Sequence, residues 1–268
     1  MQNTLNQMRL DMIKMAYTAG KSGAHIGPAL SMTELMAVLY LKEMNFDIQN
    51  PLDENRDRLI LSKGHGVIAL YAALKQVGII SEADLLTFKK NNSELSAHPT
   101  LNQKLGLEFA SGSLGQGLSQ GVGVALALRH KNNDKSKVFV ILGDGECNEG
   151  QIWEAVMSAV QFKLQNLVII IDKNNIQYDD FTNNVMNMNP LKNKFESFGI
   201  CTVEIDGHNI EAIEKALRTE HNNKPLCIIA NTIKGKGISF MENDPKWHNN
   251  ILTEELYNQA ISELGGTI

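Results

Sequence analysis

The first apolar residues of the chain recur at intervals of three and four positions, which is the spacing of an amphipathic helix. The positions that carry this spacing are Leu5, Met8, Met12, Met15 and Ala16. The spacing predicts a helix that ends near Gly20. Ser31 and Glu34 stand in front of the apolar run 35–41 and predict a second helix that begins with a capping box.

Further along the chain, short apolar runs alternate with helical patterns. The runs predict four buried parallel strands, at residues 138–142, 167–171, 202–205 and 226–230. Helices are expected at residues 67–77, after a cap at 81–84, and at 153–162 and 210–217. This order is typical of a doubly wound α/β fold, a mostly parallel sheet flanked by helices. We interpret residues 1–268 as a single domain with an N-terminal helical arm.

Composition narrows the class of protein. With 268 residues, 43% of them hydrophobic, the chain can bury the core of one large α/β domain. A formal charge of -5 and scattered lysines argue against nucleic acid as a partner. Cys147, Cys201 and Cys227 lack zinc-like spacing and favour a reducing compartment. Since residues 1–21 hold no uninterrupted apolar stretch, we expect a soluble, cytoplasmic protein with no membrane partner.

A glycine-flanked aspartate follows the first of the predicted strands. Gly143-Asp144-Gly145 comes directly after residue 142, which places Asp144 at the carboxyl edge of the sheet, where open α/β folds bind ligands. The glycines allow a sharp turn close to a phosphate, and a carboxylate there can bind a hard divalent cation. The next helix is expected to begin near Gly150, so its first amides can also face an anion.

A pair of asparagines follows the next predicted strand. Asn174 comes thirty positions after Asp144, and Asn175 follows it. Amide and backbone oxygens suit magnesium and add no negative charge beside a diphosphate. Either motif alone is more often simple turn chemistry. Their presence at consecutive strand ends favours a site for a metal and a diphosphate.

These two motifs resemble those of thiamine-diphosphate enzymes, which carry GDG and, one strand later, a closing NN. The matching stretches here are GDGECNEGQIWEA and DKNNIQYD. The resemblance implies the diphosphate-binding domain of the thiamine-diphosphate-binding fold. It also implies that Asp144, the Asn174 side chain and the Ile176 carbonyl hold Mg²⁺, or another divalent cation such as Ca²⁺ or Mn²⁺. Gly145 and Asn174 would then contact the diphosphate of thiamine diphosphate.

Four histidines stand in or beside loops that contain glycine or proline. They are His25 in SGAHIG, His65 in LSKGHG, His98 in AHP and His248 in KWH. A single histidine of this kind is most often solvated or structural. Four together favour imidazoles that exchange protons near neutral pH.

These histidine stretches resemble transketolases, and the resemblance covers nearly the whole chain. SGSLGQGL at residues 111–118 resembles the family's GPLGQG loop, with Ser113 in place of proline, and SGAHIG stands where SGHPG is common. The stretch KGISFMENDPKWH resembles members built from separate subunits. These similarities imply ketol transfer as the chemistry.

The resemblance also implies a role for each residue. His65 and His248 would contact the cofactor and the substrate. His25 and His98 would exchange protons with substrate hydroxyls. The loop residues that would pass beside the cofactor are Gly112, Ser113 and Leu114.

Other chemically capable residues receive weaker or structural roles. Glu149 and Glu154 align with transketolase glutamates, and Glu154 is assigned to the cofactor. A role at a subunit interface and direct catalysis stay open for both. Cys147 lacks a partner base and is expected to pack rather than react. His208 is expected to shape the turn before a helix, and His130 lies in a polar stretch.

In transketolases the glutamate that activates the cofactor belongs to a second, pyrimidine-binding domain. Only residues 249–268 follow His248, which is too short for that domain. We therefore expect the N-terminal subunit of a split transketolase, active only with a C-terminal subunit that carries the pyrimidine-binding domain. The resemblance implies two copies of each subunit, and hence self-association.

The expected reaction moves a two-carbon ketol unit from a ketose to an aldose, both as sugar phosphates or sulfonates. Xylulose 5-phosphate, from the pentose phosphate pathway, is the default donor. Two alternatives stay open. One is the α-subunit of a 2-oxoacid dehydrogenase, against which the histidine loops argue. The other is a non-catalytic, regulatory domain that binds thiamine diphosphate.

Overall fold

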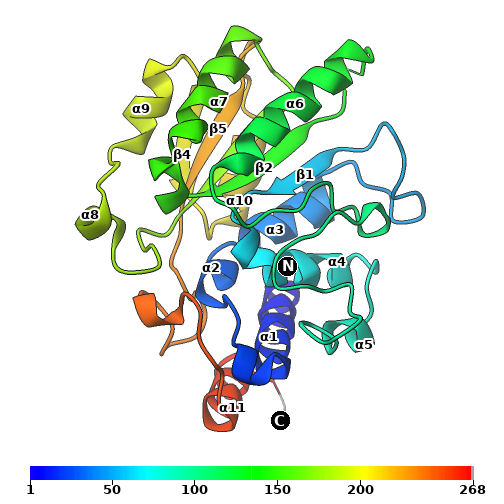
Figure 1. Cartoon of the computed structure of the whole chain (residues 1–268), viewed down its shortest axis with the longest axis vertical. Coiled ribbons are helices and arrows are strands. Elements are labelled where there is room, and N and C mark those ends of the chain that lie inside the picture. The colour runs from blue at the N-terminus through cyan, green and yellow to red at the C-terminus, as the bar shows by residue number, and fades with distance from the viewer. Residues whose placement is uncertain (134, 267–268) are drawn as a thin grey trace.

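The computed structural model describes residues 1–133 and 135–266 and contains a five-stranded sheet (Figure 1). Its strands are β1 (Arg58–Leu61), β2 (Val138–Gly143), β3 (Leu167–Lys173), β4 (Cys201–Asp206) and β5 (Leu226–Asn231). They lie in the order β1-β2-β3-β5-β4, and each neighbouring pair is parallel. The predicted α/β fold is confirmed, and the two motif-bearing strands, β2 and β3, are neighbours.

Strand β1 is missing from the pattern-based prediction. Its apolar run covers only residues 59–61 and follows charged residues, so the run is too short to distinguish a strand. The four predicted strands lie within β2 to β5. Because helices cover both faces of the sheet, β2, β3 and β5 are buried along almost their whole length.

Helices precede, separate and follow the strands. The longer helices are α1 (Gln2–Thr18), α4 (Val67–Gln76), α6 (Gln116–His130), α7 (Gly150–Gln161), α10 (Ile210–Leu217) and α11 (Glu254–Glu263). The shorter ones are α2 (Gly27–Leu30), α3 (Thr33–Val38), α5 (Glu82–Leu85), α8 (Thr182–Val185) and α9 (Leu191–Ser197). In Figure 1, α6 and α7 lie side by side across the sheet, while α1 and α4 lie near its lower end.

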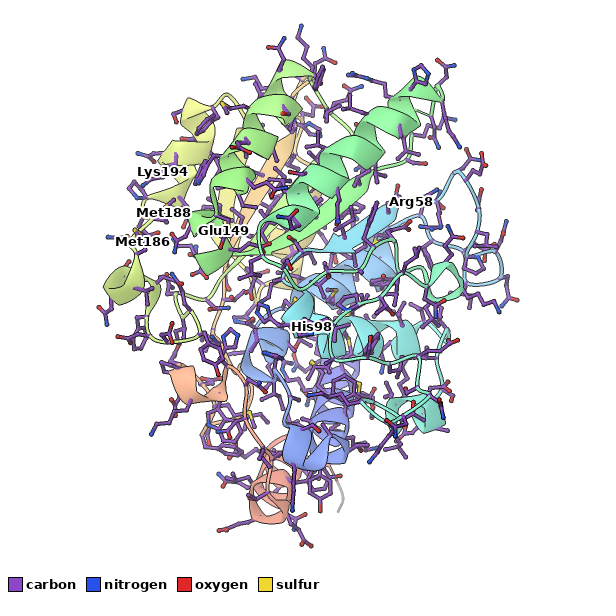
Figure 2. All side chains as sticks on the ribbon, viewed as in Figure 1. Arg58, His98, Glu149, Met186, Met188 and Lys194 are labelled. Carbon is purple, nitrogen blue, oxygen red and sulfur yellow. The ribbon has the colours of Figure 1, made fainter. Side chains whose placement is uncertain are left out.

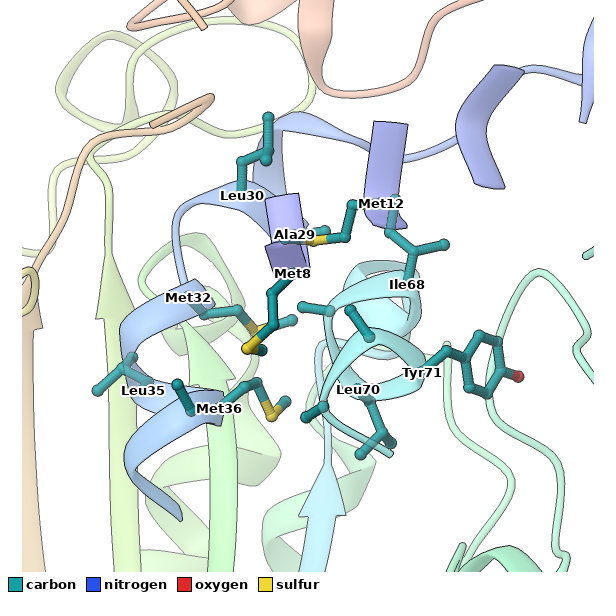
Figure 3. Packing of buried hydrophobic residues seen from close by; sticks show 14 of the residues in the cluster. Met8, Met12, Ala29, Leu30, Met32, Leu35, Met36, Ile68, Leu70 and Tyr71 are labelled. Atoms are coloured by element: carbon teal, nitrogen blue, oxygen red, sulfur yellow. The ribbon is translucent and has the colours of Figure 1, made fainter. Parts of the chain in front are cut away.

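Two hydrophobic cores lie on opposite faces of the sheet, because alternate strand residues point in opposite directions. Phe139 and Ile141 of β2 belong to the core that includes residues of α1, α3 and α4. Figure 3 shows the methionine-rich part of this core between those helices. Val140 and Leu142 belong to the other core, with residues of α6, α7 and α9. The alternation seen along β2 therefore places the sheet between two helical layers.

Helix α6 is missing from the prediction because its glycines weaken the helical pattern. The structure gives these glycines a packing role. A Cβ on Gly117 would lie 2.5 Å from Cβ of Ser62, and one on Gly121 would lie 2.4 Å from Cγ2 of Val140. Only glycine lets α6 approach the sheet this closely, which brings its first turn to the ends of β1 and β2.

One of the two expected helix caps is wrong and the other is confirmed. Helix α3 begins at Thr33 with no side-chain cap, because the Ser31 hydroxyl donates instead to Asp172 and to the Pro28 carbonyl. In α5 the Ser81 side chain accepts from the Asp84 amide, and the Asp84 carboxylate accepts from the Ser81 amide. A motif read along the chain cannot reveal a distant partner such as Asp172.

The N-terminal helix predicted to end near Gly20 is α1, which ends at Thr18. It packs on α4, and its Tyr17 stacks on Tyr257 of α11 with ring centroids 4.3 Å apart. Among residues 1–133 and 135–266, no helix combines the length and the apolar character needed to cross a membrane.

Candidate functional site

A cavity of about 350 Å³ opens where β2 and β3 end. The predicted site residues that line it are His25, His65, His98, Gly112, Leu114, Asp144, Gly145, Asn174, Ile176 and His248. Figure 2 labels two lining residues, His98 and Glu149, which come from segments far apart in the sequence. Residues from connections that lie far apart in the sequence therefore meet in one place.

Asp144 and Asn174 meet because β2 and β3 are parallel neighbours, with Gly143 opposite Asp172. The Asp144 carboxylate accepts from the Gly145 amide at 2.9 Å and from the Asn175 amide at 2.7 Å. Burial, and then the charge of Asp172, raise the pKa of Asp144 to about 6. A cation at this carboxylate would offset both effects and stabilise its charged form.

Asp172 lies beneath this pair and is fully buried. It accepts hydrogen bonds from the side chains of Ser31, Lys63, Asn174 and Thr232. Burial alone would raise its pKa, but Lys63 and these donors outweigh burial and keep the pKa below its usual value. Asp172 therefore orients the Asn174 amide and anchors Lys63 under the cavity.

The polar frame of the site is completed by two carboxylates, those of Asp172 and Glu146, and by two lysines, Lys63 and Lys234. The sequence motifs do not predict Glu146, Lys63 or Lys234. The Lys234 ammonium is buried and donates to the Ile176 and Gln177 carbonyls at 3.0 and 3.1 Å. Burial, then Lys63, lower the pKa of Lys234 to about 7. The only feature of the sequence that marks Lys234 is its place in the stretch KGK, and a solvent-exposed loop can contain the same stretch.

Glu146 ties the first motif to the glycine loop before α6. Its carboxylate accepts from the Gly115 amide at 2.8 Å, the Gly143 amide at 3.1 Å and the Ser62 hydroxyl. Burial raises its pKa. Glu146 thus sets the distance between the loop carrying Asp144 and the loop carrying Gly112.

The four predicted histidines gather around the cavity. The ring centroid of His25 lies 5.5 Å from those of His65 and His98 and 5.6 Å from that of His248. His65 and His248 are stacked at 4.9 Å. A Cβ on Gly112, whose φ is +144°, would lie 3.0 Å from the His98 ring, so this position requires glycine.

Burial and nearby positive groups keep these imidazoles neutral. Burial, followed by His98 and Lys89, lowers the pKa of His25 to about 4. Burial, followed by Lys234, lowers the pKa of His248 to about 3. Burial also lowers the pKa values of His65 and His98. Near pH 7 each ring therefore offers one N–H donor and one nitrogen acceptor.

This cluster predicts that acid destabilises the fold. Below the ordinary histidine pKa of 6.5, the unfolded chain binds protons that folded His25 and His248 bind only near about pH 4 and 3. The free energy of unfolding should therefore fall as pH falls from about 7 to 4. Asp144, with its raised pKa of about 6, and Glu146, whose pKa burial also raises, act in the opposite direction, but four histidines with lowered pKa values oppose them. Urea unfolding across this range measures the slope.

The matched variants are His25→Asn, in the cluster, and His130→Asn, at an exposed position. Replacing His25 should reduce the pH dependence of the unfolding free energy, and replacing His130 should leave it unchanged. Equal slopes for both variants would contradict a proton linkage through the cluster.

Two predicted residues do not line the cavity. Ser113 is exposed, and Glu154 lies on the exposed side of α7, beyond its first turn. Glu149, at the start of that helix, does line the cavity. The cofactor roles of Ser113 and Glu154 stay predictions, since the cavity within this chain does not reach them.

Residues set aside from the site lie outside the cavity. Cys147 is fully buried, and burial raises its thiol pKa well above the usual value, which fits the expected packing role. His130 is exposed at the end of α6. His208 does more than shape its turn, because its ring bridges Glu34 and the Ile233 amide at 2.9 and 2.8 Å.

The cavity also contains polar atoms that lack partners within the described part of the chain. The side-chain oxygen of Asn148 and the side-chain nitrogen of Gln177 are buried and make no hydrogen bond there. Buried polar groups normally find partners, so such atoms mark where a polar ligand can bind. With the Asp144 carboxylate and the Asn174 amide beside them, the donor set fits a diphosphate and a hard cation.

Comparisons with known proteins identify the family of this chain. The family model for the transketolase, thiamine diphosphate binding domain matches residues 1–267. The chain is 40% identical over 244 residues to one subunit of the apulose-4-phosphate transketolase of Actinobacillus succinogenes, covering 91% of this chain and 88% of that protein. It is 41% identical over 267 residues to 6-deoxy-6-sulfo-D-fructose transketolase subunit SqwG of a Clostridium species, covering 98% and 94%.

A solved structure shows the same fold in a longer protein. The transketolase of Campylobacter jejuni superposes with a TM-score of 0.90 at 33% identity, covering 99% of this chain. The match covers 42% of the Campylobacter chain. The sequence matches and the superposition cover nearly the same residues. The chain therefore belongs to the transketolase family, in which it corresponds to the thiamine-diphosphate-binding domain.

Proposed function

We propose that this chain is the diphosphate-binding subunit of a transketolase-type enzyme that transfers a two-carbon ketol unit from a ketose to an aldose. The observation that carries the proposal is that His25, His65, His98 and His248 surround the cavity that Asp144 and Asn174 also line. Asp144 and Asn174 account for a site that binds the cofactor. The four histidines add groups that can exchange protons with a substrate rich in hydroxyl groups.

The cofactor assignment rests on the donor set at the ends of β2 and β3. Asp144, the Asn174 side chain and the Ile176 carbonyl would hold Mg²⁺, or Ca²⁺ or Mn²⁺, and Gly145 with Asn174 would contact the diphosphate. When bound, thiamine diphosphate supplies the electron sink for breaking and forming the carbon–carbon bond. The Ile176 carbonyl also accepts from Lys234, so this ammonium lies beside the proposed metal ligands.

The histidines would accept and donate the protons that move during the reaction. When the donor bond breaks, the hydroxyl on the released fragment loses its proton and becomes a carbonyl. When the new bond forms, the former aldehyde oxygen of the acceptor takes up a proton. Neutral His25 and His98, with ring centroids 5.5 Å apart, can accept the first proton and supply the second. His65 and His248 would contact the cofactor and orient the substrate.

A separate subunit would complete the site. Two relatives that match over 88% and 94% of their own length are named as subunits of transketolases, which supports a divided enzyme. The partner would carry the pyrimidine-binding domain and the glutamate that activates the cofactor, in a heterotetramer with two copies of each chain. Free cysteines at 147, 201 and 227 are compatible with a reducing compartment, and we place the complex in the cytoplasm.

Substrates would be ketoses and aldoses that carry a phosphate or sulfonate group. The relatives named for apulose 4-phosphate and for 6-deoxy-6-sulfo-D-fructose support both classes. Affinity purification of the chain from its source cell tests the divided enzyme. We expect a pyrimidine-domain subunit in stoichiometric amount, and its absence would overturn the two-subunit proposal.

The reaction itself is tested with the purified complex. We expect ketol transfer from a panel of ketose phosphates and sulfonates to aldose acceptors, and no release of carbon dioxide from 2-oxoacids. Carbon dioxide release without ketol transfer would identify the 2-oxoacid dehydrogenase alternative. Binding of thiamine diphosphate with neither activity would instead identify a regulatory domain.

A further inference from the structure

A buried polar network lies outside the cavity and joins three distant parts of the chain. Arg9 of α1 and Glu34 of α3 are each 4% exposed and form an ion pair. The other Glu34 oxygen lies 2.9 Å from Nδ1 of His208, which follows β4. Burial would raise the pKa of Glu34, but His208 and Arg9 outweigh burial and lower it. Glu34 is therefore the charged centre of an Arg9–Glu34–His208 network.

The outer ends of this network hold the backbone on both sides of Lys234. The Ile233 amide donates to Nε2 of His208 at 2.8 Å, so the proton of the neutral ring resides on Nδ1 and is donated to Glu34. On the other side, Nε of Arg9 donates to the Lys236 carbonyl at 3.1 Å. Hydrogen bonds therefore hold the segment 233–236 at the Ile233 amide and at the Lys236 carbonyl.

Lys234 connects the segment 233–236 to the residues that line the cavity. Its ammonium contacts the Ile176 carbonyl at 3.0 Å, the Gln177 carbonyl at 3.1 Å and Nδ1 of His248 at 2.8 Å. These groups engage all the hydrogens of a single ammonium. A shift of the 233–236 backbone would thus move His248 and the 176–177 loop together.

We propose that Glu34 and His208 are positioning residues, which act through Ile233 and Lys234 to place His248 and the Ile176 carbonyl. An ion pair as buried as this is weak support for stability, because apolar residues of similar volume often serve equally well. Apolar residues could not supply the acceptor to Ile233 or the donor to Lys236. The part of the proposal that concerns cofactor affinity rests on the proposed function.

Hydrogen exchange of the full chain tests the placement independently of activity. Glu34→Gln and His208→Phe should each speed exchange of the Ile233 amide about tenfold, since its acceptor is disturbed or lost. The matched control is Glu108→Gln, which disturbs the Arg56–Glu108 ion pair, a largely buried pair that makes no hydrogen bond to this segment. We expect no change at Ile233 in the control. Equal exchange at Ile233 in all variants would overturn the proposal.

Thiamine diphosphate binding to the purified complex tests the effect on the site. Glu34→Gln should weaken binding roughly tenfold relative to Glu108→Gln, the scale of one positioned hydrogen bond. His208→Gln, which keeps an acceptor and a donor, should restore part of the affinity that His208→Phe loses. Equal affinities of Glu34→Gln and Glu108→Gln for thiamine diphosphate would show that the network stabilises the fold without positioning the site. If the wild-type complex binds no thiamine diphosphate, the proposed function fails, and exchange at Ile233 still decides the placement.

Discussion

Replacing Asp144 with Asn should weaken magnesium-dependent binding of thiamine diphosphate about a hundredfold or more, because a ligating carboxylate is lost. The free energy of unfolding of the ligand-free chain should stay the same or increase. The reason is that burial and Asp172 raise the pKa of Asp144 to about 6, so its charge opposes folding at pH 7 in the absence of a cation. Isothermal titration calorimetry and urea unfolding measure the two quantities.

The matched control for this substitution is Asp179→Asn, an exposed carboxylate on the loop that follows β3. It should alter neither cofactor affinity nor stability. Opposite effects on binding and stability are the signature of a residue retained for function rather than for folding. Undiminished binding by the Asp144 variant would contradict the metal assignment.

Replacing Lys63 with Met should lower the free energy of unfolding by about 3–5 kcal/mol, because it leaves the buried Asp172 charge without its cation. Lys63 is 1% exposed and also donates to the Pro28 carbonyl at 2.9 Å. Chemical denaturation of the free chain measures the loss. The site should be disturbed as well, because Asp172 also orients Asn174.

The double variant Lys63→Met, Asp172→Asn separates charge from packing. The neutral amide introduced at position 172 removes the unpaired charge. Its oxygen can still accept from Thr232 and its NH2 group can donate to the Ser31 hydroxyl, so part of the lost stability should return. A loss below about 1 kcal/mol in the single variant, or a further loss in the double variant, would contradict a buried charge pair as the anchor.

The parts of the site that follow strand ends could be predicted from the sequence. Asp144 and Asn174 come two and three positions after the apolar runs that end at residues 142 and 171, and parallel strands place such positions at one edge of the sheet. The four histidine loops were expected near one another only through the family resemblance, since their segments are far apart in the chain. The structure brings all four rings to the same cavity.

The polar frame beneath the site could not be predicted in this way. Lys63, Lys234 and Glu146 are charged residues in loops, and such residues are usually solvated. Their burial depends on partners contributed by other elements, as Asp172 is for Lys63. The role of Ser31 could not be predicted for the same reason, because its hydroxyl donates to Asp172 and does not cap a helix. Patterns along the chain report faces and ends of elements, but not contacts across the fold.

A crystal structure of the purified complex with thiamine diphosphate and Mg²⁺ tests the central proposal most directly. We expect the cation at Asp144, the Asn174 side chain and the Ile176 carbonyl. We also expect the diphosphate at Gly145 and Asn174, with His25, His65, His98 and His248 facing the thiazolium ring. Cofactor bound elsewhere, or bound without a cation at Asp144, would contradict the proposed site.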